Sequence, residues 1–186
     1  MNEVEAVKTK QEIELVDSLL RKHKSDLYGD IWRAGVNLGL RIGDLLSIEY
    51  SQLDLDRKEL SLVESKTGKT KHMALNATVV AIVERRRAAY PTDRYLFQTH
   101  SNRTANTVAP VGRVTVSKAF SEVGNIVGVK LGTHSMRKSR GWAMYSDGVS
   151  IEMIAKVLNH SSPSVTMAYL GITKAEVMQT YLEYEL

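Results

Sequence analysis

The stretch Leu158-Asn159-His160-Ser161-Ser162-Pro163-Ser164-Val165-Thr166-Met167-Ala168-Tyr169 places a histidine nine residues before a tyrosine near the C-terminus of the chain. Its Ser162-Pro163 pair predicts the first turn of a helix, because proline is favoured at the first helical position. Two upstream segments carry further polar groups: Thr133-His134-Ser135-Met136-Arg137 and Gly39-Leu40-Arg41-Ile42-Gly43-Asp44. Together these segments hold arginine, histidine and tyrosine side chains, which can bind a phosphodiester and attack it without a metal ion.

Arg41 lies close to two glycines and ahead of an apolar segment, so it could be an ordinary surface turn residue. Its guanidinium is also a planar fork that suits two oxygens of a phosphate. Asp44, three residues later, would then hold this fork in place, or would only cap the short helix expected over 44–48.

His134 and Arg137 are three residues apart and would share one face of a helix. Thr133 is the predicted N-cap, which puts both side chains near a helix end that favours anions. A cation at that end is unfavourable for the helix itself, and phosphate binding would explain it. A His-x-x-Arg pair is also common as a purely structural feature.

His160 and Tyr169 each have an ordinary structural interpretation as well. A histidine at the end of a helix can interact with the helix dipole, and a tyrosine is often a half-buried aromatic. Lys66, in the predicted turn Ser65-Lys66-Thr67-Gly68-Lys69, could be a solvated hairpin tip or could reach into a DNA groove and donate a proton. The occurrence of all these fragments in one order favours a site for phosphate chemistry.

Composition limits the class of protein. A chain of 186 residues suits a single domain with a proper core, and its net charge of +4 permits a polyanionic partner without requiring one. The chain has no cysteines, which excludes disulfides, thiolate nucleophiles and cysteine-based zinc sites. The N-terminus is acidic and polar, unlike a signal peptide, and no apolar run approaches membrane-spanning length. We therefore expect a cytoplasmic protein with no membrane contact.

The residue pattern predicts a mainly α domain with a small antiparallel β-sheet, an α+β fold. Helices are expected over 10–24, 26–38 and 44–48, with Gly39 ending the second. Two short strands, 60–65 and 71–75, would form a hairpin. A polar loop is expected over 99–110. Further helices are expected after the N-cap candidates Asn76, Thr133, Ser150, Ser162 and Thr173.

In this order and spacing the motifs resemble those of the tyrosine recombinases, the lambda-integrase-like family. The resemblance covers residues 26–169, nearly the whole chain. It rests on the Gly-Leu-Arg entry, the hairpin lysine, the His-x-x-Arg pair and the Leu-Asn-His…Tyr block. Met136 stands where the family more often has leucine, and Asn159 where many members have glycine. Phage and integrative-element integrases are the most similar subgroup.

The resemblance implies an enzyme that breaks and rejoins DNA with no metal or other cofactor. Tyr169 would attack the scissile phosphate, form a 3′-phosphotyrosyl link and release a 5′-hydroxyl. A phenol has a pKa of about 10 and is mostly protonated at neutral pH, so it needs help. Arg41 and Arg137 would clamp the non-bridging oxygens of the phosphate.

Three further side chains complete the implied catalytic set. Lys66 would be the acid for the leaving 5′-oxygen, His134 would assist proton transfer and His160 would donate to a phosphate oxygen. Other basic residues are weaker candidates for contact with DNA, mainly through its phosphates. These are Lys69, Lys71, Arg103, Arg113, Lys138 and Arg140.

The resemblance also implies double-stranded DNA as the partner. It implies a homo-tetramer on paired DNA sites, built from a chain that is a monomer in isolation, with accessory DNA-bending proteins as candidate helpers. Family members usually carry an N-terminal core-binding domain, and the sequence predicts that it is absent here, either because the chain is a trimmed fragment or because it is naturally short. Residues 1–9 would be an extension or linker, and the last helix, 173–186, would dock on a neighbouring protomer or on its own domain.

Other functions fit parts of the same pattern. A short invertase of the fimbrial phase-switch type and a type IB topoisomerase would share the chemistry, and a requirement for paired sites separates recombinase from topoisomerase. A catalytically silent DNA-binding protein would keep the fold but has no need of Tyr169 in this register. A metal hydrolase using His134 and His160 has the least support, because no His-Glu-x-x-His or carboxylate-rich pattern is present.

Overall fold

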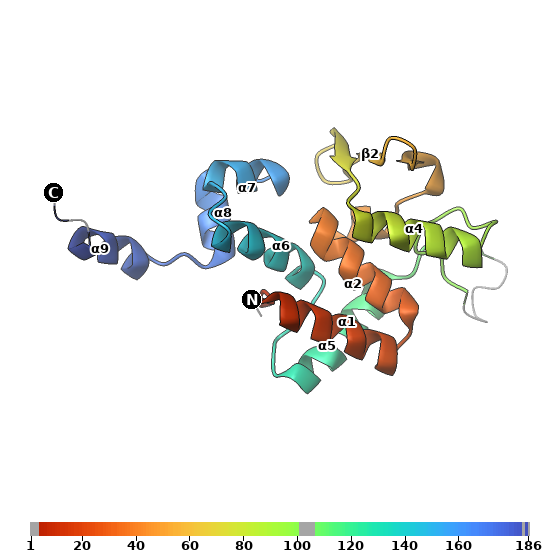
Figure 1. The fold of residues 1–186 in the computed structure, drawn as a ribbon, viewed down its shortest axis with the longest axis horizontal. Coiled ribbons are helices and arrows are strands. Elements are labelled where there is room, and N and C mark those ends of the chain that lie inside the picture. Colours follow the sequence, from red (N-terminus) through yellow and green to blue (C-terminus); the bar gives the residue numbers. More distant parts are fainter. Residues whose placement is uncertain (1–3, 101–106, 184, 186) are drawn as a thin grey trace.

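A computed structural model describes residues 4–100, 107–183 and 185 (Figure 1). In this part of the chain helices predominate, and one small antiparallel sheet lies at an edge of the main body, which confirms the mainly α prediction (Figure 1). The helices of the first part are α1 (Lys10–His23), α2 (Asp26–Leu38), α3 (Ile42–Leu46), α4 (Ala77–Ala89) and α5 (Arg113–Val127), with a 3₁₀ turn at Tyr50–Gln52. The helices that follow are α6 (Ser135–Ser146), α7 (Ile151–Val157), α8 (Pro163–Leu170) and α9 (Lys174–Glu183).

The main core is built around α2, which contacts α1, α4 and α6. Trp32 of α2 is fully buried and packs edge-on against Phe120 of α5, with ring centroids 5.5 Å apart. The indole nitrogen of Trp32 donates a hydrogen bond to the carbonyl of Ile13 at 3.0 Å, so its one polar group is satisfied. α2 is therefore held on several sides, and its C-terminal end gives the site a fixed base.

The sheet has three antiparallel strands in the order β1 (Leu53–Asp54), β2 (Glu59–Val63) and β3 (Thr70–Ala74). The predicted hairpin is confirmed as β2 and β3, each beginning one residue earlier than expected. The strand β1 is too short to leave an alternating pattern, and it was not predicted. On β2, Leu60 and Leu62 face the core while their neighbours are exposed, which is the period of a half-buried strand.

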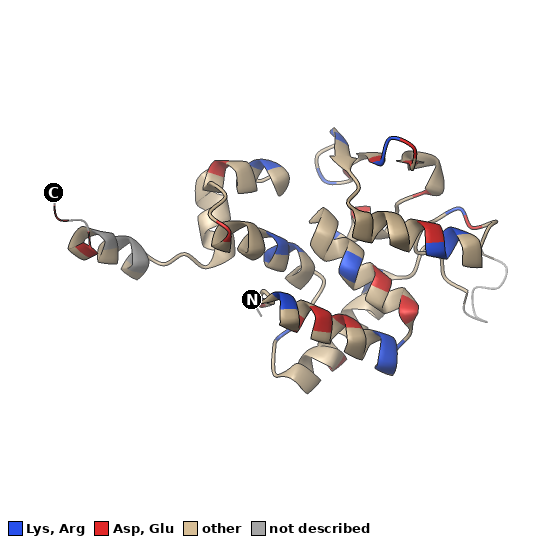
Figure 2. Ribbon diagram, in the orientation of Figure 1, with Lys and Arg blue, Asp and Glu red and all other residues tan. Residues whose placement is uncertain are grey.

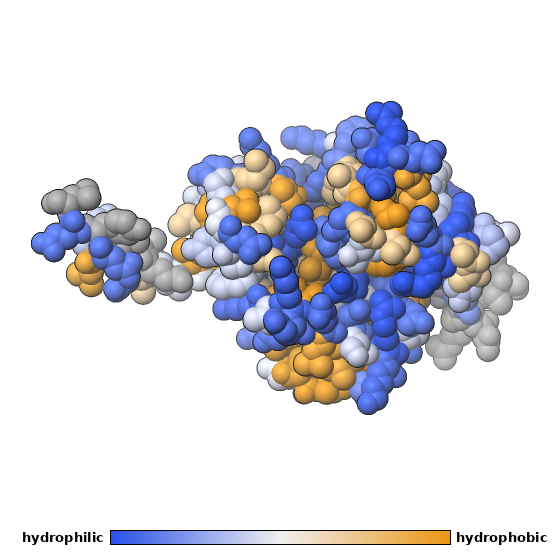
Figure 3. Space-filling view, viewed as in Figure 1, coloured by the Kyte–Doolittle hydropathy of each residue, from blue (hydrophilic) through white to orange (hydrophobic). Residues whose placement is uncertain are grey.

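The C-terminal helices form a smaller layer beside the main body. α7 and α8 pack against each other and against α6, around a second apolar cluster of Ile154, Leu158 and Leu170. In Figures 1 and 3, α9 stands clear of the rest of the molecule, and three of its apolar side chains, Met178, Tyr181 and Leu182, are exposed. None of the helices in the described residues is both long and apolar enough to cross a membrane.

Most of the predicted helix ends are confirmed. Gly39 ends α2 in a left-handed conformation, with φ 62°. The side chains of Asn76, Ser150 and Ser162 cap α4, α7 and α8. α3 begins at Ile42, two residues before the expected start.

The prediction of Thr133 as the N-cap of α6 is wrong. His134 occupies that position and gives no side-chain capping bond. A turn from Gly132 to Ser135 leads into the helix instead, with the Ser135 amide donating to the Gly132 carbonyl at 2.9 Å. The capping pair expected for α9 involves the side chain of Glu176, which lies outside the described part.

The segment before α1 lies along α6. Val7 is 2% exposed, and its amide donates to the hydroxyl of Ser139 at 2.8 Å. The amide of Glu5 donates to the carbonyl of Lys130 at 3.0 Å. Residues 4–8, which we call the N-terminal segment, are thus in contact with the helix that carries Arg137.

Candidate active site

Arg137 is fixed at the junction between α6 and the main body. Its side chain is buried, with the residue 3% exposed, and Nη1 donates to the carbonyl of Gly39 at 2.6 Å. Gly39 is the left-handed residue that ends α2, and the next turn carries Arg41. The hydrogen bond therefore links the two arginines of the predicted set through one residue of backbone.

Arg41 lies just before α3 and is partly exposed. Its Nη1 pairs with Oε1 of Glu64 at 3.2 Å, and Glu64 is buried at 1% exposure. Asp44, the residue expected beside Arg41, accepts hydrogen bonds from the amide and hydroxyl of Ser65 at 2.9 and 2.6 Å. The carboxylate that holds the guanidinium is thus Glu64, and Asp44 holds the start of the hairpin turn.

Lys66 lies exposed at the tip of the hairpin, between two anchored neighbours. Ser65 bonds to Asp44, and the hydroxyl of Thr67 donates to Oε2 of Glu64 at 3.0 Å. Lys69 is exposed on the far side of the same turn. The residues on both sides of Lys66 are therefore bonded to buried carboxylates, while Lys66 itself is exposed.

Lys71 differs from the other two hairpin lysines because it faces inward. It is paired with Leu62 in the sheet register, and side chains of directly paired residues lie on the same face. Its Nζ donates to the carbonyl of Val157 at 2.8 Å, near the C-terminal end of α7. Burial and the charges of Arg137 and Arg41 lower the pKa of Lys71, although Glu64 opposes the shift.

His160 and Tyr169 meet where α7 and α8 come together. The edge of one ring faces the other, with centroids 4.9 Å apart and planes at 74°. Nδ1 of His160 lies 3.0 Å from the hydroxyl of Thr166, which is buried in α8. The hydroxyl of Tyr169 donates a long hydrogen bond, 3.4 Å, to the carbonyl of His134.

The electrostatics of the site keep these groups uncharged. Burial raises the pKa of Tyr169 to about 12, although the charge of Arg137, a hydrogen bond with it and the charge of Arg41 oppose the rise. Burial lowers the pKa of His160 to about 4, and the charges of Arg137 and Arg41 add to this effect. Desolvation, followed by the charges of Arg137 and its basic neighbours, also lowers the pKa of His134. At neutral pH the phenol and the His160 imidazole are therefore uncharged, and the pKa of His134 is shifted in the same direction as that of His160.

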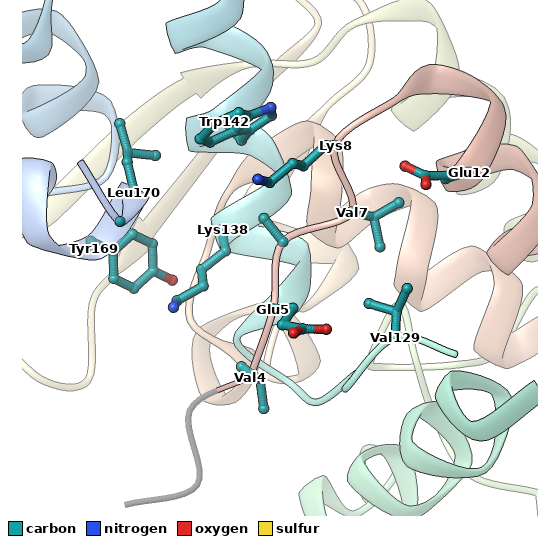
Figure 4. Close-up of a pocket in the computed structure, with 12 residues that line it drawn as sticks. Val4, Glu5, Val7, Lys8, Glu12, Val129, Lys138, Trp142, Tyr169 and Leu170 are labelled. Carbon is teal, nitrogen blue, oxygen red and sulfur yellow. The ribbon is translucent and has the colours of Figure 1, made fainter. Parts of the chain in front are cut away.

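Tyr169 borders a pocket of about 500 Å³ that also involves the N-terminal segment (Figure 4). Lys138 projects into this pocket from α6, with Nζ 5.4 Å from the centre of the Tyr169 ring. Val4, Glu5 and Lys8 line the opposite side. Figure 2 shows basic residues on the hairpin and along α6, the two elements that carry Lys66 and Arg137.

The other predicted DNA contacts are distributed around this set. Arg113 begins α5 and is exposed, and its charge contributes to the lowered pKa of His134. Arg140 is partly buried, and burial lowers its pKa. Arg103 lies outside the described residues. In the part of the chain that the structure describes, no three His, Asp or Glu side chains come together as a metal site.

The sequence analysis missed two groups that organise the site. One is Glu64, whose signal is the alternation Leu60, Leu62, Glu64, in which a carboxylate takes an inward position. The other is the contact of Thr166 with His160, whose signal is a threonine six residues after the histidine. Asn159 was singled out only as a departure from glycine, and its amide proves to donate to Oε2 of Glu64.

The chain is similar in sequence to several integrases and recombinases. It is 28% identical over 183 residues to the probable integrase/recombinase YoeC of Bacillus subtilis (strain 168), with 97% of each chain covered. It is 25% identical over 138 residues to the tyrosine recombinase XerA of Pyrococcus furiosus, covering 73% of this chain and 46% of that one. The chain thus spans nearly all of YoeC but about half the length of XerA.

Solved structures show the same fold. The crystal structure of XerA recombinase matches with a TM-score of 0.72 and 17% identity, covering 100% of this chain and 66% of that one. A lambda integrase(75-356) dimer bound to a COC′ core site matches with a TM-score of 0.68 and 17% identity, covering 91% and 61%. The fold is therefore that of the tyrosine recombinase catalytic domains.

The sequence model of the phage integrase family matches residues 31–176. This range begins within α2 and ends in α9, so it contains the sheet and every helix that carries a predicted catalytic residue. A match over this much of the chain is not confined to a short motif, and the chain belongs to the phage integrase family.

Proposed function

We propose that this chain is the catalytic domain of a site-specific DNA recombinase, which cuts and rejoins strands through a bond between Tyr169 and a 3′-phosphate. The observation that carries the proposal is the position of the Tyr169 phenol, whose hydroxyl lies 3.4 Å from the His134 carbonyl at the start of the helix that carries Arg137. Arg137 is in turn bonded to Gly39, two residues before Arg41, and the charges of both arginines oppose the rise in the pKa of Tyr169. These residues come from α8, α6 and the turn before α3, so the fold and not local sequence brings them together. Membership of the phage integrase family supports the same reaction.

In the proposed cleavage step, the Tyr169 oxygen forms a bond to the scissile phosphorus and the bond to the 5′-oxygen breaks. Lys66 gives a proton to that leaving oxygen, which departs as a 5′-hydroxyl. Arg41 and Arg137 bind the non-bridging oxygens, whose charge is greatest in the transition state. The reverse step, with a 5′-hydroxyl as nucleophile, rejoins a strand and returns the phenol, so no external energy source is needed.

The histidines act as neutral groups in this scheme. His134 takes the phenolic proton, since its lowered pKa leaves an imidazole nitrogen free to accept it. We assign the Thr166 hydroxyl as the donor to Nδ1 of His160, so that Nε2–H of His160 donates to a phosphate oxygen. A pKa of about 12 keeps Tyr169 protonated until DNA is bound, which limits attack in the absence of substrate.

Double-stranded DNA is the proposed partner. Solved relatives with the same fold include XerH bound to a difH substrate and lambda integrase bound to a core site. On DNA we propose a homo-tetramer in which α9, with Met178, Tyr181 and Leu182 exposed, docks on a neighbouring protomer. A cytoplasmic location and accessory DNA-bending proteins remain parts of this proposal.

Covalent trapping on DNA tests the proposed function. The protein is mixed with a pool of nicked duplexes of randomised sequence, and detergent-resistant adducts are collected with Tyr169→Phe as the matched control. We expect adducts with the parent chain, none with Tyr169→Phe, and an enriched sequence in the trapped DNA.

Three outcomes would contradict the proposal. Binding of DNA without any adduct would indicate a silent DNA-binding protein. An adduct that persists in Tyr169→Phe would show that another side chain is the nucleophile. Adducts and relaxation of supercoiled DNA with no requirement for paired sites would instead favour a topoisomerase.

A further inference from the structure

One carboxylate outside the predicted set joins three parts of the proposed site. Oε1 of Glu64 pairs with Arg41 at 3.2 Å, and Oε2 accepts a hydrogen bond from the Thr67 hydroxyl at 3.0 Å. Oε2 also accepts from the side-chain amide of Asn159. A single buried side chain thus connects the turn before α3, the hairpin tip and the connection between α7 and α8.

The position of Glu64 follows from the geometry of β2. Leu60 and Leu62 face the core, and Glu64 is the next inward position after them. An apolar residue would be the ordinary choice there, because a buried carboxylate is costly unless it is paired and hydrogen-bonded. A charged group at this point therefore needs a reason beyond packing.

The partners of Glu64 keep it ionised. Burial on its own would raise the pKa of Glu64, but the hydrogen bonds from Asn159 and Thr67 and the charges of Arg41 and Lys71 outweigh burial and hold the pKa below its usual value. At neutral pH the carboxylate is therefore ionised and accepts from Arg41, Thr67 and Asn159. Its loss would leave these three partly buried donors without their shared acceptor.

Asn159 meets Glu64 from a special backbone conformation. Its φ is 47°, in the left-handed region, which glycine and asparagine adopt most readily. Glycine would fit the backbone but would lack the amide that reaches Glu64. Asn159 directly precedes His160, so this amide fixes the residue before a proposed catalytic histidine.

We propose that Glu64 is a positioning residue for DNA cleavage. Its hydrogen bond with Asn159 holds the connection between α7 and α8, which carries His160, against the turn before α3 and the hairpin tip, which carry Arg41 and Lys66. The proposal rests on the proposed function. Glu64 acts through Arg41, the hairpin tip with Lys66, and His160, and it does not touch the DNA itself. Its role is to keep Arg41 and Lys66, on one side of the site, at a fixed distance from His160, on the other.

The sign of the charge makes this proposal testable. A carboxylate near bound phosphate repels it, so an effect through charge alone predicts that Glu64→Gln binds DNA more tightly and cleaves at least as fast. A positioning role predicts slower cleavage with unchanged or tighter binding. The two roles therefore shift the cleavage rate in opposite directions.

The experiment uses a nicked duplex carrying the sequence recovered from the trapped pool. Single-turnover adduct formation at saturating protein gives the cleavage rate, and a binding titration gives the Kd. We expect Glu64→Gln to lower the cleavage rate about 10- to 100-fold, the loss typical of a small misplacement of reacting groups. Glu59→Gln, on the exposed face of the same strand, removes the same charge as a control and should cleave at the parent rate.

Asn159 provides a second and independent arm. Asn159→Gly keeps the left-handed backbone and removes only the amide donor, so we expect slower cleavage from a protein that melts at nearly the parent temperature. In the double variant with Glu64→Gln, the fold-loss in cleavage rate should be smaller than the product of the two single fold-losses, because both substitutions act on the same contact. Asn159→Asp should cleave more slowly than Asn159→Gly, because it places a second carboxylate against Glu64. Adding Glu64→Gln removes this repulsion and should recover part of the lost cleavage rate.

Each result has a defined meaning. Parent-rate cleavage by Asn159→Gly, or fully multiplicative losses in the double variant, would overturn the pairing. Parent-rate cleavage by Glu64→Gln would overturn the positioning role, and if that variant melts below the assay temperature, the Asn159 variants decide the matter. A parent chain that forms no adduct on any DNA would mean that the proposed function has failed, and the positioning role with it.

Discussion

The two parts of the molecule that share the proposed site are stabilised in different ways. Arg41 and Glu64 belong to the main body, where Leu40, Leu45 and Leu62 around them are part of the large apolar core. Tyr169 and His160 belong to α7, α8 and their connection, which contain only a small apolar cluster of their own among the described residues. Packing therefore fixes the side with Arg41, the proposed phosphate-binding side. Polar contacts hold much of the side with Tyr169, the proposed nucleophile side.

α6 and a few polar bonds connect these two parts. Met136 of α6 is buried in the main core, and one turn and a half later Gly141 allows Leu158 and Leu170 to approach closely. Across the gap, Asn159 bonds to Glu64 and Lys71 bonds to the carbonyl of Val157. Because the two apolar clusters are separate, we expect that the nucleophile side can be loosened without unfolding the phosphate-binding side.

The largest expected effect concerns the hairpin that lies between the two parts. If Lys66 is the general acid, Lys66→Ala should slow cleavage about 100- to 10,000-fold. A substrate with sulfur in place of the scissile 5′-oxygen should restore most of the rate, because a thiolate leaves without a proton. Lys71→Ala should show little such rescue, since its ammonium is bonded to Val157. Rescue of Lys71→Ala but not of Lys66→Ala would reverse the assignment.

The next effect concerns the arginine that joins the two parts. Arg137→Ala should lower the cleavage rate about 100- to 1,000-fold, the loss typical of one donor to a developing oxyanion. It should also lower the melting temperature, because the carbonyl of Gly39 loses its 2.6 Å partner. Arg137→Lys, which keeps the charge but not the planar fork, should recover stability better than activity. Equal recovery of both would argue against a bidentate clamp on phosphate.

A matched pair of core variants separates the two parts directly. Phe120→Ala, against Trp32 in the main core, should cost about 3–5 kcal/mol of global stability. Ile154→Ala, in the small cluster, should leave the main melting transition nearly unchanged but should slow adduct formation, since α7 and α8 lose their apolar anchor. Circular dichroism melting and single-turnover trapping measure the two effects. An equal fall in melting temperature for both variants would mean that the molecule has one cooperative core.

The smallest expected effect is a pH dependence of stability that arises on the nucleophile side. The folded protein holds the pKa of His160 at about 4, below the value of an unfolded histidine, so the unfolded state binds more protons between these values. Stability from this group is complete above about pH 6.5 and is lost as the pH falls toward 4, by about 1–2 kcal/mol given its partial exposure. His160→Gln should reduce this slope in urea titrations. An unchanged slope would place the titrating group elsewhere.

Local sequence rules predicted those features of the fold that depend on neighbouring residues. The bounds of α2, its left-handed end at Gly39 and the Asn76 cap are as expected, because each depends on a few adjacent residues. The two predicted strands each begin one residue earlier than expected and β1 was missed, because strand ends depend on pairing with a distant partner. The cap of α6 was misassigned because the turn before it satisfies the backbone without Thr133.

The site was predictable to a similar degree. The ordered motifs marked Arg41, Arg137, His160 and Tyr169, whose charges and rings interact in the structure. The partner of Arg41 was not predictable from spacing, since Asp44 is nearer in sequence than Glu64 and has the same charge. Only the register of the hairpin and the left-handed conformation at Asn159 bring Glu64 into contact with both sides.

Native-state hydrogen exchange tests most directly the claim that the two parts are separately stabilised. Amide exchange in α7 and α8, residues 151–170, is compared by mass spectrometry with exchange in α2, residues 26–38. We predict that α7 and α8 open at a lower free energy than α2, and that Asn159→Gly lowers it further without changing α2. Exchange of all three helices at the free energy of global unfolding would contradict the account, because the proposed nucleophile Tyr169 would then be fixed by the same core as Arg41.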